Sequence, residues 1–433
     1  MASNFPNEVQ ENIFRHMDAE NLMRAKKVCR RWNEIILNME QRGSLWLEYC
    51  LGEIPSYTLT DITKLQELSV ACRGNIYHHV LSKLGWIFWK EIFKEYIRTR
   101  RIKLDLYVIT NVRYSPHCGQ VTALAFNDLL LYSGFENGDV CLWKNIDASQ
   151  ISTKVTDSIH CPVQAIYCNS KGTTCSKLQG KHQKTESLMV VYKDKVKLYR
   201  TENKSAGFGL QWQWQKEVPR KSSEYPREFC SVPVGSDVWF EWYSGGYVYS
   251  VSDQTKKKRM EDNRSTQITA ADSSNRKVVY GTRTGDVFSF SLTDTCEFEK
   301  YLSDLSYRGN VGSSVRQLIS KGEYILCLTD DSDIFVSDGS SIFHKLDVHG
   351  VFGCHVECIA WYASILVIGT KYGAVRVYHV PGEKDILSLE LNNCTVIQLN
   401  CEHVNALAIG DDGSRPVVAV ATDALGVIHI IRW

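Results

Sequence analysis

From about residue 104 onward, the sequence repeats one pattern of short apolar segments separated by Gly, Asp and Asn turns. Each unit has an apolar segment, a short turn, a second apolar segment, a tight turn that often has the form GxxxG, and a third segment ending in an aromatic residue. Short alternating segments with turn residues between them predict three consecutive strands of one antiparallel sheet. The units begin at Val121, Val163, Ile268, Val315, Val356 and Val404.

The spacing of these units predicts the architecture. Three intervals between consecutive unit starts are 42, 41 and 48 residues, which match the roughly 40–45-residue period of β-propeller repeats. The interval from Val163 to Ile268 has room for one further unit, for which residues 238–251 are the candidate. We therefore expect an all-β propeller over residues 104–433. Seven units of about 47 residues fit best, and six or eight are the alternatives.

The two ends of the repeat region predict how it closes. The last unit ends on its third strand, HIIRW, at residues 429–433, so that its sheet lacks an outer strand. An uncovered edge is a liability that folded proteins avoid. The segment Leu104 to Thr110 precedes the first unit and is free to supply the missing strand.

The N-terminal quarter of the chain predicts helices. Residues 1–50 carry apolar side chains at helical spacing over three short segments; Pro6 suits the first helical position, and Asp18 is a candidate N-cap for the second helix. A module this small buries little apolar surface by itself, so we expect it to bind a partner. Residues 51–103 predict a helical linker, with one helix capped by Asp61 and a later, aromatic one.

Composition narrows the classes of function. The 433 residues include 50 Lys and Arg against 49 Asp and Glu, for a net charge of +1. This balance argues against a general nucleic-acid or anionic-membrane binder. No apolar run is long enough to span a membrane. The polar N-terminus lacks the apolar segment of a secretory signal. The 15 scattered cysteines are typical of reduced intracellular thiols. We expect a cytosolic or nuclear protein.

The helical module resembles the F-box family. The family's apolar-Pro-x-Glu start, Ile-Phe pair, Leu-x-x-Ala and Val-Cys-x-x-Trp segments correspond here to residues 5–8, 13–14, 22–25 and 28–32, although Phe stands at the first position, where Leu is more usual. The repeats resemble WD repeats. They are degenerate, because no unit ends in the Trp-Asp dipeptide that is typical of the family. The expected all-α F-box covers residues 1–50.

The resemblance implies a function. F-box proteins bind the Skp-type adaptor of SCF ubiquitin ligases, and through it the cullin, while their C-terminal domain captures the protein substrate. The chain would then be a non-catalytic substrate receptor that binds neither nucleic acid nor membrane. The alternative is a scaffold that assembles complexes without directing ubiquitination. The residues carried over as adaptor-binding are Phe5, Pro6, Val9, Ile13, Phe14, Leu22, Val28, Cys29 and Trp32.

Motifs of other functions are absent or weak. We find no phosphate-binding loop, dinucleotide fingerprint, zinc-protease or nucleophile-elbow motif, and we expect no catalysis, cofactor or metal. Cys354, His355 and Cys358 form a short cluster, but Cys358 alternates with apolar residues in a predicted strand, so its thiol is expected in the core. The basic run 256–259 (KKKR) is expected in an exposed loop, with nuclear targeting as the alternative.

WD-type propellers bind partners through two sets of positions that can be found here. The residue after the first apolar residue of each unit gives Thr122, Gln164, Thr269, Arg316, Glu357 and Asn405. The turn between the second and third strands gives Glu136, Arg283, Asp331, Lys371 and Asp423.

Three cations in these sets are the candidate substrate-binding residues. Arg283 and Arg316 lie in neighbouring units, where phosphodegron-reading relatives place arginines, and predict a phosphate clamp. Lys371 is a third candidate cation. Asp331 and Glu357 are close enough to compete, and Asp331 is a candidate ion-pair partner of Arg316. Should these arginines prove structural, the alternative binding surface surrounds Trp239 and Trp242.

Overall fold

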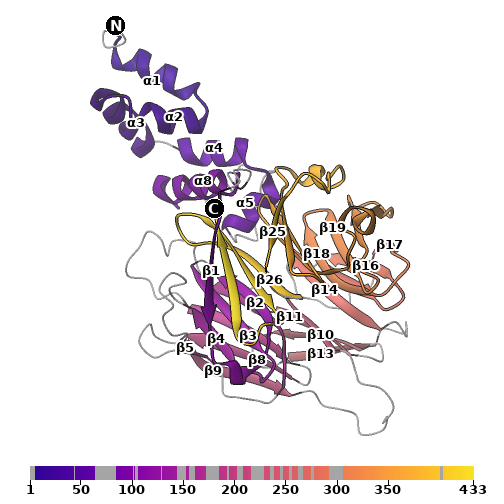
Figure 1. The fold of residues 1–433 in the computed structure, drawn as a ribbon. Helices are drawn as coiled ribbons and strands as arrows, with labels where there is room; N and C mark the ends of the chain where they lie inside the picture. The colour runs from indigo at the N-terminus through magenta and orange to yellow at the C-terminus, as the bar shows by residue number, and fades with distance from the viewer. Residues whose placement is uncertain are drawn as a thin grey trace, which may run out of the picture. The chain divides into compact units, whose positions relative to one another are not determined.

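The computed structural model (Figure 1) describes the chain in segments that form two compact units, the first ending at Ile97 and the second beginning at Arg98. The described residues are 5–42, 44–63, 84–100, 102, 106–127, 129–143, 153–155, 161–171, 185–192, 195–201, 208–215, 229–234, 238–243, 247–252, 256–261, 267–274, 277–291, 306–399 and 403–433.

The first unit is helical. Its elements are α1 (Asn7–Arg15), α2 (Ala19–Ala25), α3 (Arg30–Arg42), α4 (Leu45–Glu53), α5 (Ser56–Thr63) and most of α8 (Trp86–Arg100). Helix α3 packs on α1, α2 and α4. Helices α4 and α8 meet through aromatic side chains, with the rings of Trp46 and Phe93 5.7 Å apart.

Two predicted helix caps have different outcomes. The Asp18 side chain accepts a hydrogen bond of 2.7 Å from the backbone N–H of Asn21, which confirms the predicted N-cap of α2. Asp61 instead lies inside α5, so the prediction that it caps a helix was wrong. The segment expected to follow it, residues 64–74, is outside the described residues.

The second unit is a β-propeller. Its described strands form seven four-stranded antiparallel sheets, as many as the repeat spacing favours. Along the chain, five sheets come between the first sheet and the closing sheet. Their strands are β6 (Val163–Lys171), β7 (Thr185–Tyr192), β8 (Lys195–Thr201) and β9 (Phe208–Gln215); β10 (Phe229–Val234), β11 (Val238–Tyr243), β12 (Tyr247–Ser252) and β13 (Lys256–Glu261); β14 (Ile268–Ser274), β15 (Lys277–Thr282), β16 (Asp286–Ser291) and β17 (Ser306–Asn310); β18 (Val315–Lys321), β19 (Tyr324–Thr329), β20 (Ile334–Ser337) and β21 (His344–Leu346); β22 (Val356–Tyr362), β23 (Ile365–Thr370), β24 (Ala374–His379) and β25 (Thr395–Gln398).

The first sheet and the closing sheet meet where the ring joins. The first sheet comprises β2 (Val121–Asn127), β3 (Leu130–Phe135), β4 (Val140–Trp143) and β5 (Thr153–Lys154); the closing sheet comprises β26 (Val404–Asp411), β27 (Pro416–Thr422), β28 (Val427–Arg432) and β1 (Val108–Arg113). The innermost strands β26 and β2 contact each other. A short helix, α9 (Val348–Phe352), and two 3₁₀ turns, Pro116–Cys118 and Glu383–Ile386, interrupt the loops.

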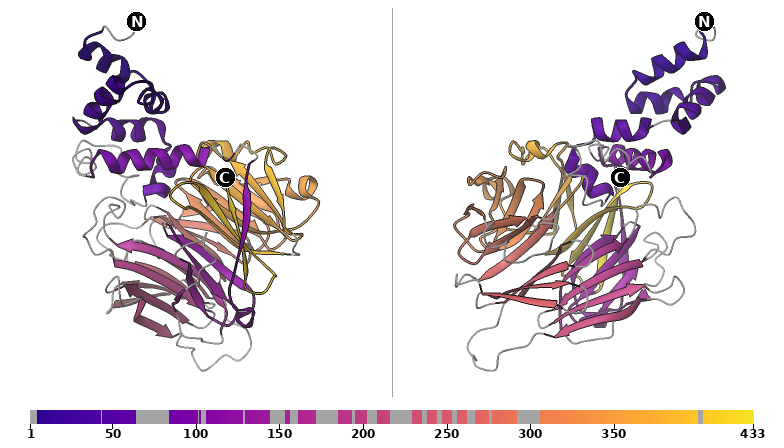
Figure 2. Two further views of the ribbon diagram at one scale, coloured as in Figure 1. Left: turned by 60° about the vertical axis from the view of Figure 1, so that its left-hand side comes forward. Right: turned by 180° about the vertical axis from the view of Figure 1, so that it is seen from behind.

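Strand β1 confirms the predicted closure of the ring. It pairs antiparallel with β28, so that Val108 faces Arg432 and Arg113 faces Val427. Figure 1 and Figure 2 show β1, in purple, beside the yellow C-terminal strands. The strand lies a few residues later than the expected 104–110. Its side chains are mostly exposed, and Val112 alone among the six is buried. The apolar core lies between sheets; one cluster joins Trp143 of the first sheet to Ile430 of the last.

The GxxxG pattern has a separate cause at each glycine. The first glycine packs against the next sheet: a Cβ on Gly281 would lie 2.5 Å from Cβ of Val315, the first residue of β18. The second glycine, Gly285, has a φ of +84° in the turn before β16, a conformation that side chains disfavour. The same two roles recur at Gly134 and Gly138.

The basic run 256–259 differs from its expectation. It belongs to β13, which pairs with β12 and is the outermost strand of its sheet. Lysine on an edge strand discourages pairing with other chains, which accounts for a run that was wrongly expected in a loop. Within the described part of the chain, no helix has the length and apolarity needed to cross a membrane.

Candidate functional site

The helical module divides its apolar side chains between an interior and an exposed surface. Phe14 and Leu22 are buried with Ile36 in one cluster, and the ring of Trp32 packs edge-on against Phe14 at 5.3 Å. Phe14 and Leu22 therefore stabilise the module from within. Their assignment to the adaptor-binding set is corrected: neither side chain is exposed.

Four large apolar side chains of the same set are exposed. The exposed fractions are 52% for Phe5, 41% for Val9, 47% for Ile13 and 64% for Val28. Val9 and Ile13 are four residues apart on α1 and so lie on one side of it. Pro6 and Cys29 are also exposed. We call Phe5, Pro6, Val9, Ile13, Val28 and Cys29 the exposed apolar set.

Two polar residues that the sequence analysis missed hold this surface together. The Arg31 guanidinium donates to the Phe5 carbonyl at 2.8 Å and to Oδ1 of Asn7 at 3.0 Å, so that the start of α3, next to Val28, is tied to the start of α1. The buried Gln10 amide donates to the same carbonyl at 2.7 Å. Arg31 falls at a variable position of the motif, and only its spacing from Trp32 could have drawn attention to it.

A buried carboxylate also went unrecognised. Glu40 of α3 has no exposed side-chain surface and lies 2.9 Å from Lys26 and 2.8 Å from Lys90. Burial lowers the pKa of Lys90, and the hydrogen bond to Glu40 opposes that effect. The triad joins α3 to α8 and to the end of α2, so it supports the geometry of the exposed apolar set.

In the propeller, β-bulges explain the first set of predicted rim positions. In six sheets, the pairing of the first two strands shifts directly after the first strand residue. The bulged residues are Thr122, Gln164, Thr269, Arg316, Glu357 and Asn405, the positions that the repeat pattern selected. A bulge re-aims the side chain at that point. Thr122 and Thr269 each donate to the first carbonyl of the next sheet, at 2.7 and 2.6 Å.

Arg316 also forms a contact between neighbouring sheets. Its guanidinium lies 2.8 Å from the Glu357 carboxylate of the neighbouring sheet, so Glu357 is its partner and Asp331 is not. Asn405 similarly donates to the Gln120 side chain at 3.2 Å. The predicted phosphate clamp needs two free guanidinium groups, and this ion pair engages one of them. The use of Arg316 in a phosphate clamp therefore stays a prediction, one that requires this ion pair to open.

The turns between the second and third strands form an equivalent set. In five sheets the backbone N–H of one turn residue donates to the carbonyl of the residue just before the first strand. These turn residues are Glu136, Arg283, Asp330, Lys371 and Asp423. Asp330 therefore occupies the position that the pattern gave to Asp331. Arg283 donates to the side-chain oxygen of Gln267 at 3.1 Å.

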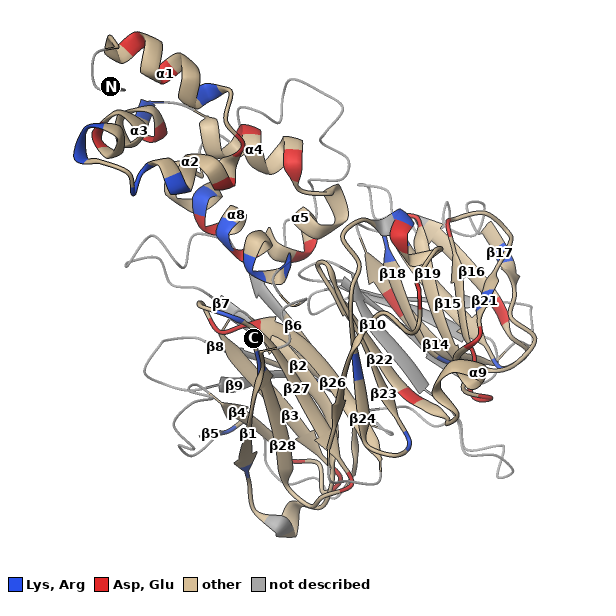
Figure 3. Ribbon diagram, turned by 45° about the horizontal axis from the view of Figure 1, so that its top comes forward, with Lys and Arg blue, Asp and Glu red and all other residues tan. Residues whose placement is uncertain are grey.

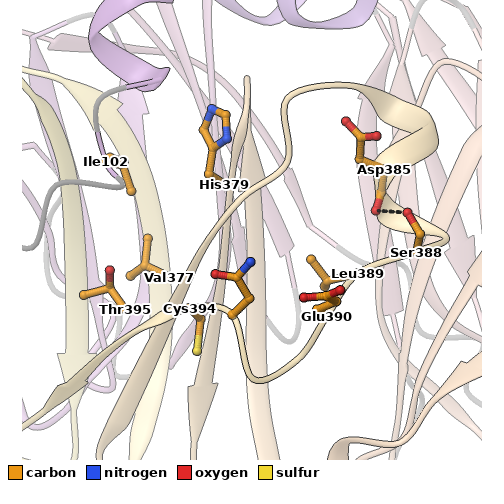
Figure 4. A pocket seen from close by; sticks show the side chains of 10 residues that line it. Ile102, Val377, His379, Asp385, Ser388, Leu389, Glu390, Cys394 and Thr395 are labelled. Atoms are coloured by element: carbon orange, nitrogen blue, oxygen red, sulfur yellow. Dashed lines mark hydrogen bonds between the residues drawn. The ribbon is translucent and has the colours of Figure 1, made fainter.

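A cavity of about 490 Å³ lies beside β24 and the loop that follows it. Figure 4 shows His379 of β24 and Cys394 on one side and Asp385 and Glu390 on the other. Its lining includes these two carboxylates and no lysine or arginine, so it disfavours an anionic ligand. The repeat pattern gave no signal for it, because the loop lies outside the repeats.

Two further predicted features can be placed. Cys358 is buried with its thiol 3.4 Å from the Val404 carbonyl, and burial raises its pKa to about 12, which confirms its expected place in the core. Strand β11 carries Trp239 and Trp242, but their side chains lie outside the described part of the chain.

Comparison with known proteins identifies the N-terminal module. Residues 2–42 match the family model of the F-box domain, which confirms that part of the resemblance. No curated protein matches the chain. Among solved structures, the chain is similar to that of the computationally designed Ika8 protein, with 16% identity and a TM-score of 0.46 over 74% of this chain and 99% of the other.

Proposed function

We propose that this chain is the substrate receptor of an SCF-type ubiquitin ligase, with the F-box docked on a Skp-type adaptor and the propeller holding the substrate. The exposed apolar set supports this proposal most directly. A small folded module that leaves Phe5, Ile13 and Val28 about half exposed or more presents the kind of anchor that partners bury. The F-box match at residues 2–42 gives the partner class.

In this role the chain performs no catalysis and acts in the cytosol or nucleus. The adaptor would link it to a cullin, and other subunits would transfer ubiquitin. The propeller contributes a rigid recognition surface. A scaffold without ubiquitination is the second candidate, favoured by the same exposed apolar set, since adaptor binding alone does not recruit the rest of a ligase.

Adaptor binding is tested with the exposed residues rather than the buried ones. Ile13→Asp combined with Val28→Asp should weaken binding to a purified Skp-type adaptor by roughly 30- to 1,000-fold, the effect of losing central interface anchors worth about 2–4 kcal/mol. Calorimetry on the full chain measures the affinity. The matched control, Asn38→Asp with Gln41→Asp, adds the same charge to exposed sites of α3 and should bind normally.

Unchanged affinity of the Ile13/Val28 variant, with a normal circular dichroism spectrum, would rule out the adaptor assignment. The ligase and scaffold alternatives are separated by co-purification with adaptor and cullin. Stoichiometric recovery of both, together with ubiquitin transfer to co-purified proteins, is expected of the ligase; adaptor without cullin is expected of the scaffold.

A further inference from the structure

Three consecutive sheets present charges at equivalent turn positions of the propeller. The backbone bonds Arg283 to Gln267, Asp330 to Ser314 and Lys371 to His355 are the same bond in the sheets that begin with β14, β18 and β22. The innermost strands of these sheets contact one another in that order. The three turns therefore lie side by side at one end of the propeller.

The charges on these turns are not neutralised by their described neighbours. Among the described residues, the Arg283 guanidinium bonds the neutral amide of Gln267 and no carboxylate. Within the described residues, no ion pair engages the side chains of Asp330, Asp331 or Lys371, and both carboxylates are exposed.

Most other charges near these turns are paired, whereas Asp286, in the same turn as Arg283, accepts hydrogen bonds from the neutral side chains of Thr284, Tyr307 and Asn310. Arg316 pairs with Glu357, and Lys345 with Asp333, which His349 also approaches at 3.3 Å. Figure 3 shows red acidic positions close to α9. At the equivalent turn positions Arg283, Asp330 and Lys371, the order of charge across the three sheets is thus positive, negative, positive.

This order is unsuited to a phosphate. A phosphate bound between Arg283 and Lys371 would face two carboxylates, and like charges brought together across an interface weaken binding strongly. The order instead complements a ligand with the reverse sequence of signs. Tyr372, 62% exposed beside Lys371, adds an aromatic surface of the type enriched in interface hot spots.

We propose that this end of the propeller binds a protein segment in which a basic side chain is flanked on both sides by acidic side chains. The basic side chain pairs with Asp330 and Asp331, and the acidic ones with Arg283 and Lys371. The inference rests on the proposed function, since it names the substrate class that the receptor would select. It needs no covalent modification of that segment.

The test uses the full chain with fluorescein-labelled synthetic peptides in anisotropy titrations. The peptides carry acid–base–acid, all-acidic, all-basic or phosphoserine patterns, with glycine spacers of increasing length. The acid–base–acid peptide should bind best, at one spacing. Asp330→Lys with Asp331→Lys should bind it about tenfold more weakly and should gain affinity for the all-acidic peptide.

Two further variants keep the result interpretable. Asp338→Lys with Glu390→Lys makes the same change in net charge at exposed sites elsewhere and should leave the preference unchanged. Asp330→Asn with Asp331→Asn replaces the charge-reversed variant should that one not fold, and should lose the acid–base–acid preference. Tighter binding of the phosphoserine peptide, equal binding of all peptides, or binding of none would each overturn the inference.

Adaptor affinity is measured on the same preparations. Normal adaptor binding with no peptide preference overturns only this inference. Failure of the unaltered chain to bind the adaptor overturns the proposed function, whichever peptide result accompanies it.

Discussion

Single residues of the repeat set how closely neighbouring sheets approach. Gly134, Gly281 and Gly369 stand at the same place in their sheets, and a Cβ on each would come within 2.5–2.6 Å of the valine that starts the next sheet. The valine is what the repeat pattern shows most clearly, and the glycine is what allows it to be buried. Each of these three sheets is thus fitted to the one that follows it.

Gly281→Ala should lower the stability of the propeller by about 1–3 kcal/mol, because the added methyl group has no space and backbone must shift. Urea unfolding of the full chain, followed by tryptophan fluorescence, measures the change. Gly52→Ala is the matched control: nothing lies within 4 Å of its Cβ, and it is in helix α4, where alanine is favoured. If the Gly281 variant is as stable as the unaltered chain, the boundary between the two neighbouring sheets, which we call a seam, is looser than the contact distances indicate.

At the scale of elements, the seam between the sheets of β18 and β22 is held by a side chain. The sheets of β2, β14 and β22 have alanine or cysteine facing a glycine at this place, whereas the sheet of β18 has Gln317 facing Leu328. The Gln317 amide reaches across to β22, donating to the Ile359 carbonyl at 2.7 Å and accepting from its N–H at 3.0 Å. A side chain here replaces the close backbone approach that occurs at Gly134, Gly281 and Gly369.

Gln317→Ala should destabilise the propeller by about 1–3 kcal/mol, since it leaves the N–H and carbonyl of Ile359 without their partner. Hydrogen exchange should show faster exchange at the Ile359 amide, with little change in the distant sheet of β26. Exchange that is uniform across all sheets would contradict a seam-specific role.

The elements show which parts of the structure a sequence can predict. Alternation and turn spacing located the three-strand units and the closing strand, because both patterns are local. The strand β13 was missed because its KKKR segment has no apolar residue to alternate with. The pattern placed both Asp331 and Glu357 near Arg316 but could not choose between them, since the choice depends on a bulge and on which sheets are neighbours. In the helical module, the motif could not separate the buried Phe14 from the exposed Ile13.

For the whole molecule, ring closure determines which truncations are tolerated. The second unit includes the end of α8: Arg98 makes two bonds of 2.9 and 3.1 Å to the Asp411 carboxylate, Thr99 bonds Ser364, and Ile102 is buried. Residues 98–433 should therefore form a soluble, cooperatively unfolding propeller. Residues 114–433, which lack β1, should be insoluble or molten because the edge of β28 is uncovered. Equal solubility and equal cooperativity of unfolding in the two fragments would contradict closure by β1.

The closing pair should also make the propeller sensitive to acid. Nδ1 of His429 on β28 lies 2.8 Å from Oδ1 of Asn111 on β1, and burial, aided by Arg113, lowers the pKa of His429. As pH falls below about 6.5, the unfolded chain takes up this proton first. The stability contributed by neutral His429 is therefore complete above that pH and declines below it.

His429→Gln should flatten this dependence when melting temperature is followed from pH 7.5 to pH 5. A variant at an exposed histidine, His344→Gln, should keep the slope of the unaltered chain. An identical slope in the His429 variant would show that other groups cause the acid sensitivity.

Pairing of Val108 with Arg432 joins positions more than 300 residues apart, and this fixes a time order during synthesis. At about 5–20 residues per second, β1 leaves the ribosome roughly 15–65 s before its partner β28 exists. Throughout that interval β1, with Val108 and Ile109 on an open strand, must stay unpaired or be shielded by a chaperone. The last sheet is then completed only once β28 has left the ribosome, and a nascent chain that stalls before β28 carries a ring that has no means of closing.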